Sequence, residues 1–339
     1  MGQSVMRRSL RSATLLQDWG SRLWRRRRER HGLVLMYHRV AEAPVDPWHL
    51  AVGPAEFKAQ LESIGKVAEV VPLAELQRSY RTAGAAKPVV SITFDDGYLD
   101  NLEIALPLLE AAGFPATVFV PTAFVGQGKP FWWDRLAWIV LGPVRLPDTL
   151  VVGTEAFQFR WEREKEPAGG PGGRDPRSSL HLLLWSELQR TSSPVRDEVL
   201  DTLAAWSGHD VDPRHAGRPM NPDELRRLTS SDSITIGGHS HSHRPLTQLS
   251  PEDVAAEVEF NLERCAELIG HRPETFSYPH GATSEEATRS LENAGIALAC
   301  TSRKDLAWEG MHPLAIPRVS VPDRSGPVFD LWLRWYWLP

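Results

Sequence analysis

The sequence predicts an α/β protein with a mostly parallel sheet, either a barrel or a doubly wound layer. From residue 33 onward, short apolar runs rich in Val, Ile and Phe alternate with amphipathic stretches, which is the pattern of strands alternating with helices. Each apolar run ends in polar residues. The composition agrees with a folded chain, because 42% of the 339 residues are hydrophobic and 24% are charged.

The composition also excludes several classes of protein. Disorder and collagen do not fit this balance of residues, and two cysteines, Cys265 and Cys300, cannot form a disulfide scaffold. The longest apolar stretches, such as residues 136–141, are too short to span a bilayer. We therefore expect a folded protein that is not an integral membrane protein.

The predicted strands and helices follow one another in a regular order. The strands are residues 33–37, 89–94, 116–120, 234–236, 275–278, 296–300 and 315–316. The helices between them include residues 54–64, 101–112, 251–269 and 285–294. The third of these helices has a clear start, because Ser250 offers an N-cap and Pro251 suits the first helical position.

The order of elements is interrupted between about residues 127 and 220. This stretch opens with Trp132 and Trp133 and contains a Gly/Pro-rich run at 166–177, so we predict a helical insertion with a mobile loop. The barrel or layer would then span residues 33–325, followed by a Trp-rich tail at 326–339.

The first 32 residues differ from the rest in charge. Residues 1–30 carry nine arginines against one aspartate and one glutamate, a net +7 that leaves −12 on the remaining chain. Apolar residues at helical spacing among the arginines indicate an amphipathic helix, and this pattern would suit an anionic membrane surface as well as packing on the protein itself. The alternative with the least support is a nucleic-acid contact.

Export is not expected from this sequence. After Arg7 and Arg8 there is neither an apolar core nor a cleavage site. We expect a cytoplasmic protein, with possible peripheral contact at the inner face of the membrane and no nucleic-acid partner.

Polar residues at the strand ends are the candidate site. In both sheet types the carboxyl ends of the strands share one edge, so these side chains are expected to meet there. They are His38, Asp95, Asp96, His239 and His280. The turn that Gly97 permits would let one of the two aspartates bind a cation while its neighbour faces the substrate as a base, although one of them could instead cap the next helix.

The run His239-Ser240-His241-Ser242-His243 favours a metal site. One helical turn would bring His239 and His243 to the same side, with His241 directed elsewhere. With Asp96 they would form a two-histidine, one-carboxylate ligand set. The alternatives are solvated histidines and a purely structural metal.

Together these residues resemble the polysaccharide deacetylase family, the NodB-homology domain. The resemblance covers about residues 33–125 and 220–322. Its motifs are Thr93-Phe94-Asp95-Asp96-Gly97, the histidine run, and Phe276-Ser277-Tyr278-Pro279-His280-Gly281. The opening Leu35-Met36-Tyr37-His38-Arg39-Val40 is similar to the branch that includes poly-N-acetylglucosamine deacetylases.

The resemblance implies a distorted (β/α) barrel and a role for each motif. Asp95 would be the general base, and Asp96, His239 and His243 would hold a divalent metal, usually Zn²⁺ and sometimes Ni²⁺ or Co²⁺. The backbone N–H of His280 would stabilise the oxyanion. The expected substrate-binding residues are Tyr278, Pro279, Trp132 and Trp133, where the indoles could stack on a sugar face or simply fill apolar space.

Two departures from the family pattern call for substitutes. Ser277 stands where many members have an arginine that orients the catalytic aspartate, and Arg318 is our candidate for that task. The late histidine that protonates the leaving amine is also missing. His38 could supply the acid or a substrate contact, or it could be a satisfied core histidine.

We therefore expect a metal-dependent hydrolase that removes N-acetyl groups from an amino sugar. The substrate would be an N-acetylated polysaccharide, as in exopolysaccharide biosynthesis, or a lipid- or nucleotide-linked glycan precursor. The alternatives are a non-catalytic glycan-binding barrel and a hydrolase of a non-sugar amide or ester.

Overall fold

The computed structural model describes residues 31–82, 88–154, 156–163, 175–211 and 217–336. The predicted basic helix at 1–30 and most of the Gly/Pro-rich run at 166–177 lie outside these residues. Within the described part of the chain, no helix has both the length and the apolarity that a membrane span requires.

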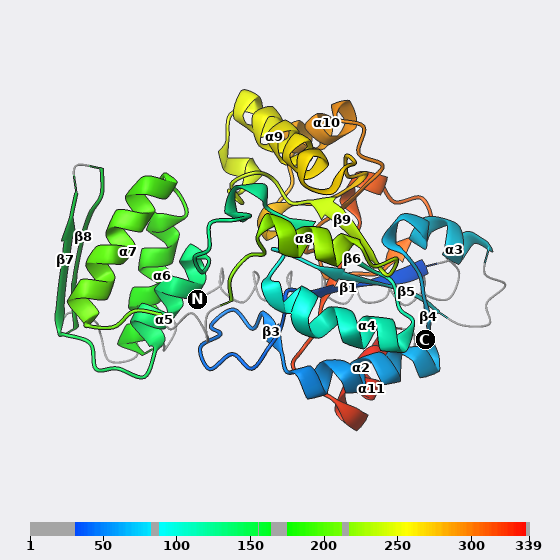
Figure 1. The fold of residues 1–339 in the computed structure, drawn as a ribbon, viewed down its shortest axis with the longest axis horizontal. Coiled ribbons are helices and arrows are strands. Elements are labelled where there is room, and N and C mark those ends of the chain that lie inside the picture. The colour runs from blue at the N-terminus through cyan, green and yellow to red at the C-terminus, as the bar shows by residue number, and fades with distance from the viewer. Residues whose placement is uncertain (1–30, 83–87, 155, 164–174, 212–216, 337–339) are drawn as a thin grey trace, which may run out of the picture.

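A parallel sheet forms the centre of the molecule, as the alternating pattern predicts (Figure 1). Its strands lie in the order β11-β10-β9-β6-β5-β1. Their bounds are β1 (His31–Tyr37), β5 (Val89–Phe94), β6 (Ala116–Val120), β9 (Ile234–Gly238), β10 (Thr275–Ser277) and β11 (Leu298–Cys300). The shorter β4 (Glu69–Val70) pairs with β5, while β12 (Ala307–Trp308) runs antiparallel to β1.

Residues 316–320 connect the two edges of this sheet. Ile316 pairs with Cys300 at the end of β11, and β13 (Val319–Ser320) pairs in parallel with β1. The Thr301 N–H donates to the Ile316 carbonyl at 2.8 Å, and the Val321 N–H donates to the Met36 carbonyl at 3.2 Å. The sheet therefore curls round into the predicted distorted barrel, and this short segment also carries Arg318 into its interior.

Helices cover the outside of the barrel. They are α2 (Pro54–Val67), α3 (Leu76–Thr82), α4 (Leu106–Ala112), α8 (Pro222–Thr229), α9 (Pro251–Ile269), α10 (Glu285–Asn293) and α11 (Gly326–Trp335). The predicted cap of α9 is present, since the Ser250 side chain accepts a hydrogen bond from the Asp253 N–H at 3.2 Å. Residues 326–335, predicted as part of a tail, form α11, which packs against α2.

Shorter elements connect these strands and helices. The two-stranded β2 (Arg39–Val40) and β3 (Ala51–Val52) enclose the loop at residues 41–50. Single helical turns are η1 (Leu73–Glu75), η2 (Asn101–Ala105), η3 (Thr122–Phe124), η5 (Leu246–Gln248), η6 (Pro279–Gly281) and η7 (Pro313–Ala315).

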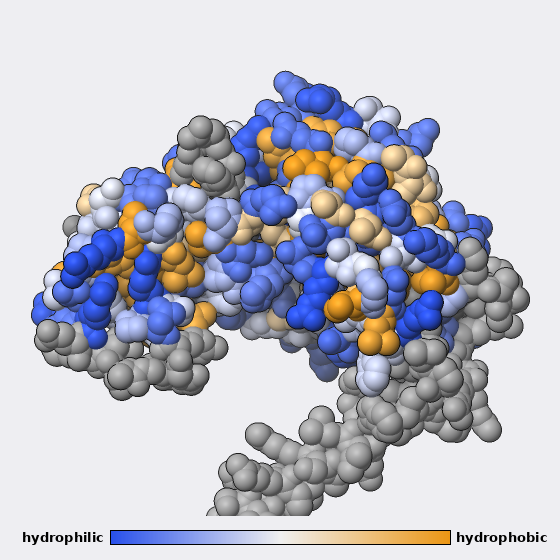
Figure 2. Space-filling model, turned by 90° about the horizontal axis from the view of Figure 1, so that it is seen from below, coloured by the Kyte–Doolittle hydropathy of each residue, from blue (hydrophilic) through white to orange (hydrophobic). Residues whose placement is uncertain are grey.

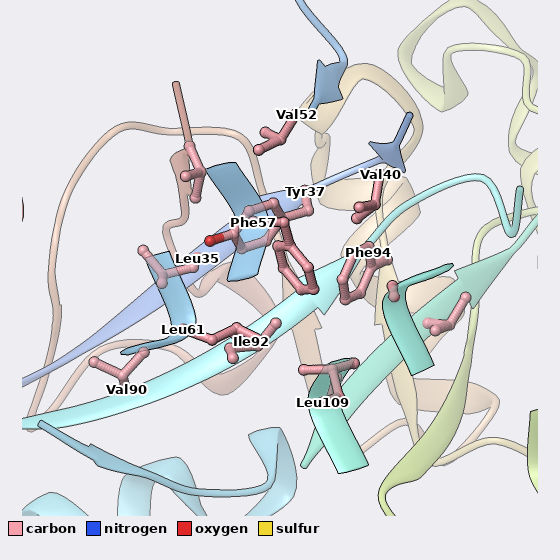
Figure 3. Packing of buried hydrophobic residues seen from close by; sticks show 14 of the residues in the cluster. Leu35, Tyr37, Val40, Val52, Phe57, Leu61, Val90, Ile92, Phe94 and Leu109 are labelled. Atoms are coloured by element: carbon pink, nitrogen blue, oxygen red, sulfur yellow. The ribbon is translucent and has the colours of Figure 1, made fainter. Parts of the chain in front are cut away.

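The main core lies between the sheet and the helices α2 and α4 (Figure 3). Tyr37, Phe57 and Phe94 pack ring against ring there, with the Tyr37 and Phe57 centroids 5.2 Å apart. The buried Tyr37 hydroxyl donates to Gln60 Oε1 at 3.0 Å, so its polar end is satisfied. This core fixes the carboxyl ends of β1 and β5, where the candidate residues begin.

The described residues between 132 and 207 form a lobe beside the barrel, at the left of Figure 1. Its elements are α5 (Trp132–Leu141), β7 (Thr149–Gly153), β8 (Gln158–Glu162), α6 (Pro176–Leu188) and α7 (Ser193–Ser207). It has an apolar cluster of its own, and in the view of Figure 2 hydrophilic residues cover most of its surface.

The predicted helical insertion contains the helices α5, α6 and α7, and it also contains an antiparallel hairpin, β7 and β8, that was not predicted. Leu150 and Val152 are buried while the residues on either side of each are exposed. This two-residue period is the strand signal that the helical prediction overlooked.

Candidate active site

The two aspartates follow β5 at a backbone turn that directs both into one cavity. Asp95 and Asp96 are each only 4% exposed. Asp96 has φ 70° and Gly97 has φ 65°, so the chain makes two consecutive left-handed residues here. A side chain at Gly97 would be strained by this conformation and would place its Cβ 3.1 Å from Val120 Cγ2. The turn thus lets neighbouring carboxylates line the same cavity instead of opposite faces of a strand.

The histidine run follows β9 as an irregular loop. The prediction of a helical turn between His239 and His243 is therefore wrong. Ser240 and His243 both have φ 58°, and the His243 N–H donates to Ser240 Oγ at 3.0 Å. This tight loop still brings the two imidazoles together, with ring centroids 4.9 Å apart. His241 points elsewhere, as predicted, with Nδ1 3.1 Å from Thr122 Oγ1.

Asp96, His239 and His243 form a set of potential metal ligands. Their ligand atoms all lie within 4.8 Å of one another. Asp96 Oδ1 lies 3.6 Å from His239 Nε2 and 3.3 Å from His243 Nε2. The same oxygen is buried and accepts no hydrogen bond from the described residues, which is the situation expected of an oxygen that binds a cation.

The electrostatics of these three residues also fit a cation. Burial lowers the pKa of His239 to about 4 and the pKa of His243 well below its usual value, so both imidazoles are neutral at pH 7. Burial, and then the Asp95 charge, raise the pKa of Asp96 well above its usual value. A divalent cation would bind the neutral imidazoles and offset the cost of a buried carboxylate.

The orientation of His239 is fixed by the next strand. Its Nδ1 lies 2.7 Å from the Ser277 carbonyl oxygen, which can only accept. Nδ1 therefore carries the hydrogen and leaves the Nε2 lone pair directed at Asp96. Such a partner on the outer nitrogen is typical of metal-binding histidines.

Asp95 forms a buried ion pair with Arg318, which is only 1% exposed. The guanidinium nitrogens lie 2.6 Å from Oδ1 and 2.7 Å from Oδ2, a bidentate geometry. Burial alone would raise the pKa of Asp95, but the charge and hydrogen bonds of Arg318 outweigh it and hold that pKa well below its usual range.

Arg318 takes up the position that Ser277 leaves open. One guanidinium nitrogen donates to Ser277 Oγ at 2.8 Å, and its Nε donates to the Thr301 carbonyl at 3.1 Å. A long arginine side chain from the segment beside β13 thus reaches the aspartate across the short serine. Arg318 therefore contacts Asp95 as expected of a substitute for the missing third-motif arginine, and its role in orienting the aspartate stays a prediction.

His38 is a further neighbour of Asp95. Its Nε2 is 4.0 Å from Asp95 Oδ2, and its side chain is 18% exposed to the cavity. Burial lowers the pKa of His38, which the Asp95 charge partly opposes, so the ring is neutral at pH 7 and can accept or donate a proton there.

These residues line one cavity of about 730 Å³ at the carboxyl ends of the strands. Trp133 lines it and packs on His243, with ring centroids 5.0 Å apart. His280 also lines it, on a left-handed turn with φ 58°, and its ring centroid is 4.7 Å from that of His243.

Three residues predicted to bind substrate are absent from the described lining of this cavity: Tyr278, Pro279 and Trp132. Tyr278 follows Ser277 in an extended chain, so its side chain leaves the opposite face, where it is fully buried and donates to the Leu314 carbonyl. Pro279 is buried as well, and Trp132 packs under the Arg196 guanidinium at 5.1 Å.

Asn261 on α9 is a positioning residue that the sequence reasoning missed. Its Nδ2 donates to the Val120 carbonyl at 2.9 Å and to the Ser240 carbonyl at 2.5 Å, and its Oδ1 accepts from the His239 N–H. It thereby joins the end of β6 to the histidine loop. A polar residue within the buried stripe of this helix was the available signal.

Asp95, Asp96, His239 and His243 lie in two segments of the chain that match a known protein family. Residues 82–145 and 202–299 match the profile of the family described as polysaccharide deacetylase, which leaves out residues 146–201 of the lobe. YxkH of Bacillus subtilis (strain 168), whose name places it among the polysaccharide deacetylases, is 25% identical over 114 residues. That match covers 33% of this chain and 40% of the length of YxkH.

Solved structures share the fold. The deacetylase PplD of Streptococcus pyogenes, in complex with acetate, aligns with a TM-score of 0.57 at 15% identity, over 92% of this chain and 100% of PplD. IcaB of Ammonifex degensii aligns with a TM-score of 0.56 at 17% identity, over 91% of this chain and 97% of IcaB.

Proposed function

Because this chain belongs to the polysaccharide deacetylase family, we propose that it is a metal-dependent hydrolase that removes the N-acetyl group of an amino sugar in a glycan. The proposal depends on the arrangement of residues at the carboxyl ends of the strands, which we call the barrel mouth. An ionised aspartate held by Arg318 lies beside the ligand set of Asp96, His239 and His243, all within one cavity.

Asp96, His239 and His243 would hold the metal, and Zn²⁺ suits two imidazoles and one carboxylate. When bound, such a cation polarises an acetamide carbonyl and lowers the pKa of a water molecule. The unpartnered Asp96 Oδ1 and the two neutral imidazoles support this assignment.

Asp95 would take the proton from the attacking water. Its carboxylate is ionised at neutral pH, and Arg318 fixes its plane with two hydrogen bonds. Each carboxylate oxygen has a second lone pair, so the pair with Arg318 still leaves room to accept a proton. Fixed orientation of this kind is what general base catalysis requires.

His280 and His38 would complete the reaction. The His280 backbone N–H would donate to the carbonyl oxygen as that oxygen gains negative charge. His38, neutral and with Nε2 4.0 Å from Asp95 Oδ2, would accept the proton that Asp95 takes from the water and pass it to the leaving amine. Both residues line the cavity.

Replacing Asp95 with asparagine tests the proposal. Acetate release from N-acetylglucosamine oligosaccharides should fall by about 10²–10⁴-fold, the usual contribution of a general base. Metal content, measured on the same sample by plasma mass spectrometry, should stay unchanged because Asp95 is not a ligand. Full activity in Asp95→Asn, or a wild-type protein that binds no metal, would contradict the proposal.

The type of glycan and the location of the enzyme need separate measurements. We propose an N-acetylated polysaccharide or a lipid- or nucleotide-linked precursor, and acetate release over a panel of all three distinguishes them. The cytoplasmic location and the membrane contact of residues 1–30 remain predictions, which the distribution of the full chain between membrane and soluble fractions would test.

A further inference from the structure

An aromatic wall made of Trp48, Trp185 and His280 stands across one side of the cavity, and all three residues line it. The Trp48 and Trp185 rings have centroids 5.0 Å apart, and the Trp185 and His280 rings meet edge to face at 5.9 Å. The wall therefore runs without a gap from the loop after β2, through helix α6 of the lobe, to the turn after β10.

Trp185 comes from the part of the lobe that the family profile does not match. Its helix is firmly placed, because the Arg177 guanidinium donates to the carbonyls of Val140, Gly142 and Val144 at 2.6–3.0 Å. These bonds fasten the first turn of α6 to the end of α5. Trp185 is thus held in a fixed position in the wall.

Trp48 is presented by a constrained loop and has an unused donor. Asp46 accepts hydrogen bonds from the Leu50 and Ala51 N–H groups, both at 2.9 Å, and His49 is held at φ 54°. The Trp48 Nε1–H is buried and meets no acceptor among the described residues. A buried donor without a partner costs free energy, so this N–H is suited to an oxygen of a bound ligand.

The remaining lining of the cavity is different. It includes Lys304 and Ser320, which are exposed and polar, and the exposed Ser302, which donates to the His280 carbonyl at 3.2 Å at one end of the wall. A sugar can therefore approach from the side of β11 and β13, whereas the wall closes the side over β5, β6 and β9. The cavity of about 730 Å³ has the size of a pocket that encloses one small ligand.

We propose that this wall makes the enzyme act on the sugar at the end of a glycan chain, with Trp48 Nε1–H donating to an oxygen of that sugar. The proposal rests on the N-deacetylase function proposed above and adds the position of the sugar to it. A chain running through the site would have to cross the space that Trp48 and Trp185 fill, so an internal sugar cannot reach Asp95.

The position of deacetylation in a tetrasaccharide of N-acetylglucosamine tests this inference. Mass spectrometric sequencing of the early product should find the free amine on one terminal sugar with the wild-type protein. Trp185→Ala should raise the share of internal deacetylation at least tenfold, whereas Trp185→Phe should keep the wild-type pattern. The matched control is Trp335→Ala, because Trp335 is 60% exposed and outside the described lining of the cavity.

Two outcomes would overturn the inference: internal deacetylation by the wild type, or an unchanged pattern in Trp185→Ala with its thermal unfolding transition intact. If Trp185→Ala does not fold, Trp48→Ala opens the same wall from the other side. Absence of acetate release from every glycan would instead count against the deacetylase function.

A binding measurement keeps the inference testable without turnover. In an Asp95→Asn background, calorimetry should give the same affinity for the di- and tetrasaccharide, because only the end of the chain enters. Trp48→Phe retains the ring but removes the N–H, so it should weaken both affinities about five- to tenfold. Affinity that rises steeply with chain length would contradict a closed pocket.

Discussion

The barrel mouth and the lobe are held together in different ways. The mouth buries ionisable groups, with Asp95, Asp96, His239 and Arg318 each less than 5% exposed. The lobe is built around leucines, valines and tryptophans. Buried charges need compensating partners and cost desolvation energy, whereas apolar packing is favourable without them. Removing one partner of a buried charge pair in the mouth should therefore lower both activity and stability, whereas substitutions in the lobe should act through packing and access.

The largest expected effect is a difference in metal content and activity between variants of two histidines in the same loop. His243→Ala removes a ligand, so we expect loss of the bound metal and a fall in acetate release of more than about 10³-fold. His241→Ala, whose ring contacts Thr122, should keep the metal and stay within about threefold of wild-type activity. Metal content and initial rates on the same preparations check both.

Equal metal loss in the two histidine variants would show that the loop as a whole holds the cation. This result would contradict the view that the site depends on individual side chains whereas the lobe depends on the packing of many. A melting curve for each variant separates ligand loss from unfolding, since neither change should lower the melting temperature by more than a few degrees.

Arg318→Lys should have a smaller effect. Lysine keeps the charge but cannot make the bidentate pair with Asp95, so we expect kcat to fall about 10²-fold while the metal is retained. The weaker pairing should raise the pKa of Asp95, so the acid limb of the pH–rate profile should move to higher pH.

The control for Arg318 is Arg303→Lys, which changes a side chain that is 60% exposed. It should leave both kcat and the pH profile unchanged. If the acid limb of the pH–rate profile is the same in Arg318→Lys as in the wild type, the guanidinium contributes only to folding. Arg318 would then resemble the packing residues of the lobe.

The contrast between the two regions also explains what the sequence could predict. Strand ends converge at one edge of a parallel sheet, so Asp96, His239 and His243 could be assigned to one site from the order of residues alone. Arg318 could be proposed because Ser277 stands where the family resemblance calls for an arginine that orients Asp95. These inferences depend on sheet topology, on the chemistry of single residues and on that resemblance.

Other features depend on how distant segments pack, and these escaped prediction. The shape of the histidine loop comes from left-handed residues and from Glu257 on α9, which accepts from the Ser242 N–H at 2.7 Å. Trp48 and Trp185 become neighbours only once the lobe docks on the barrel. Tyr278 was misplaced because one step along an extended chain reverses the side-chain direction.

The smallest expected effect concerns the seam between the two regions. Asp134 lies in the first turn of helix α5 of the lobe. Its Oδ2 accepts from the Tyr98 hydroxyl at 2.9 Å, and that hydroxyl in turn accepts from Trp133 Nε1. Burial raises the pKa of Asp134 to about 7, although Arg39 partly opposes the rise. The folded state therefore binds a proton here that the unfolded state releases near pH 4.

A raised pKa in the folded state stabilises the protein at low pH, and this contribution is lost as the pH rises from about 4 through about 7. Asp134→Asn keeps the acceptor for Tyr98 and removes the titration, so it should be more stable than the wild type at pH 8 by about 2 kcal/mol. Urea unfolding of the metal-free proteins between pH 5 and 8 measures this difference, since a bound cation nearby would favour the ionised aspartate. If the free energy of unfolding depends on pH in the same way in both proteins, Asp134 behaves like the apolar residues of the lobe. If the difference between the two proteins grows with pH, Asp134 behaves like the charged residues of the mouth.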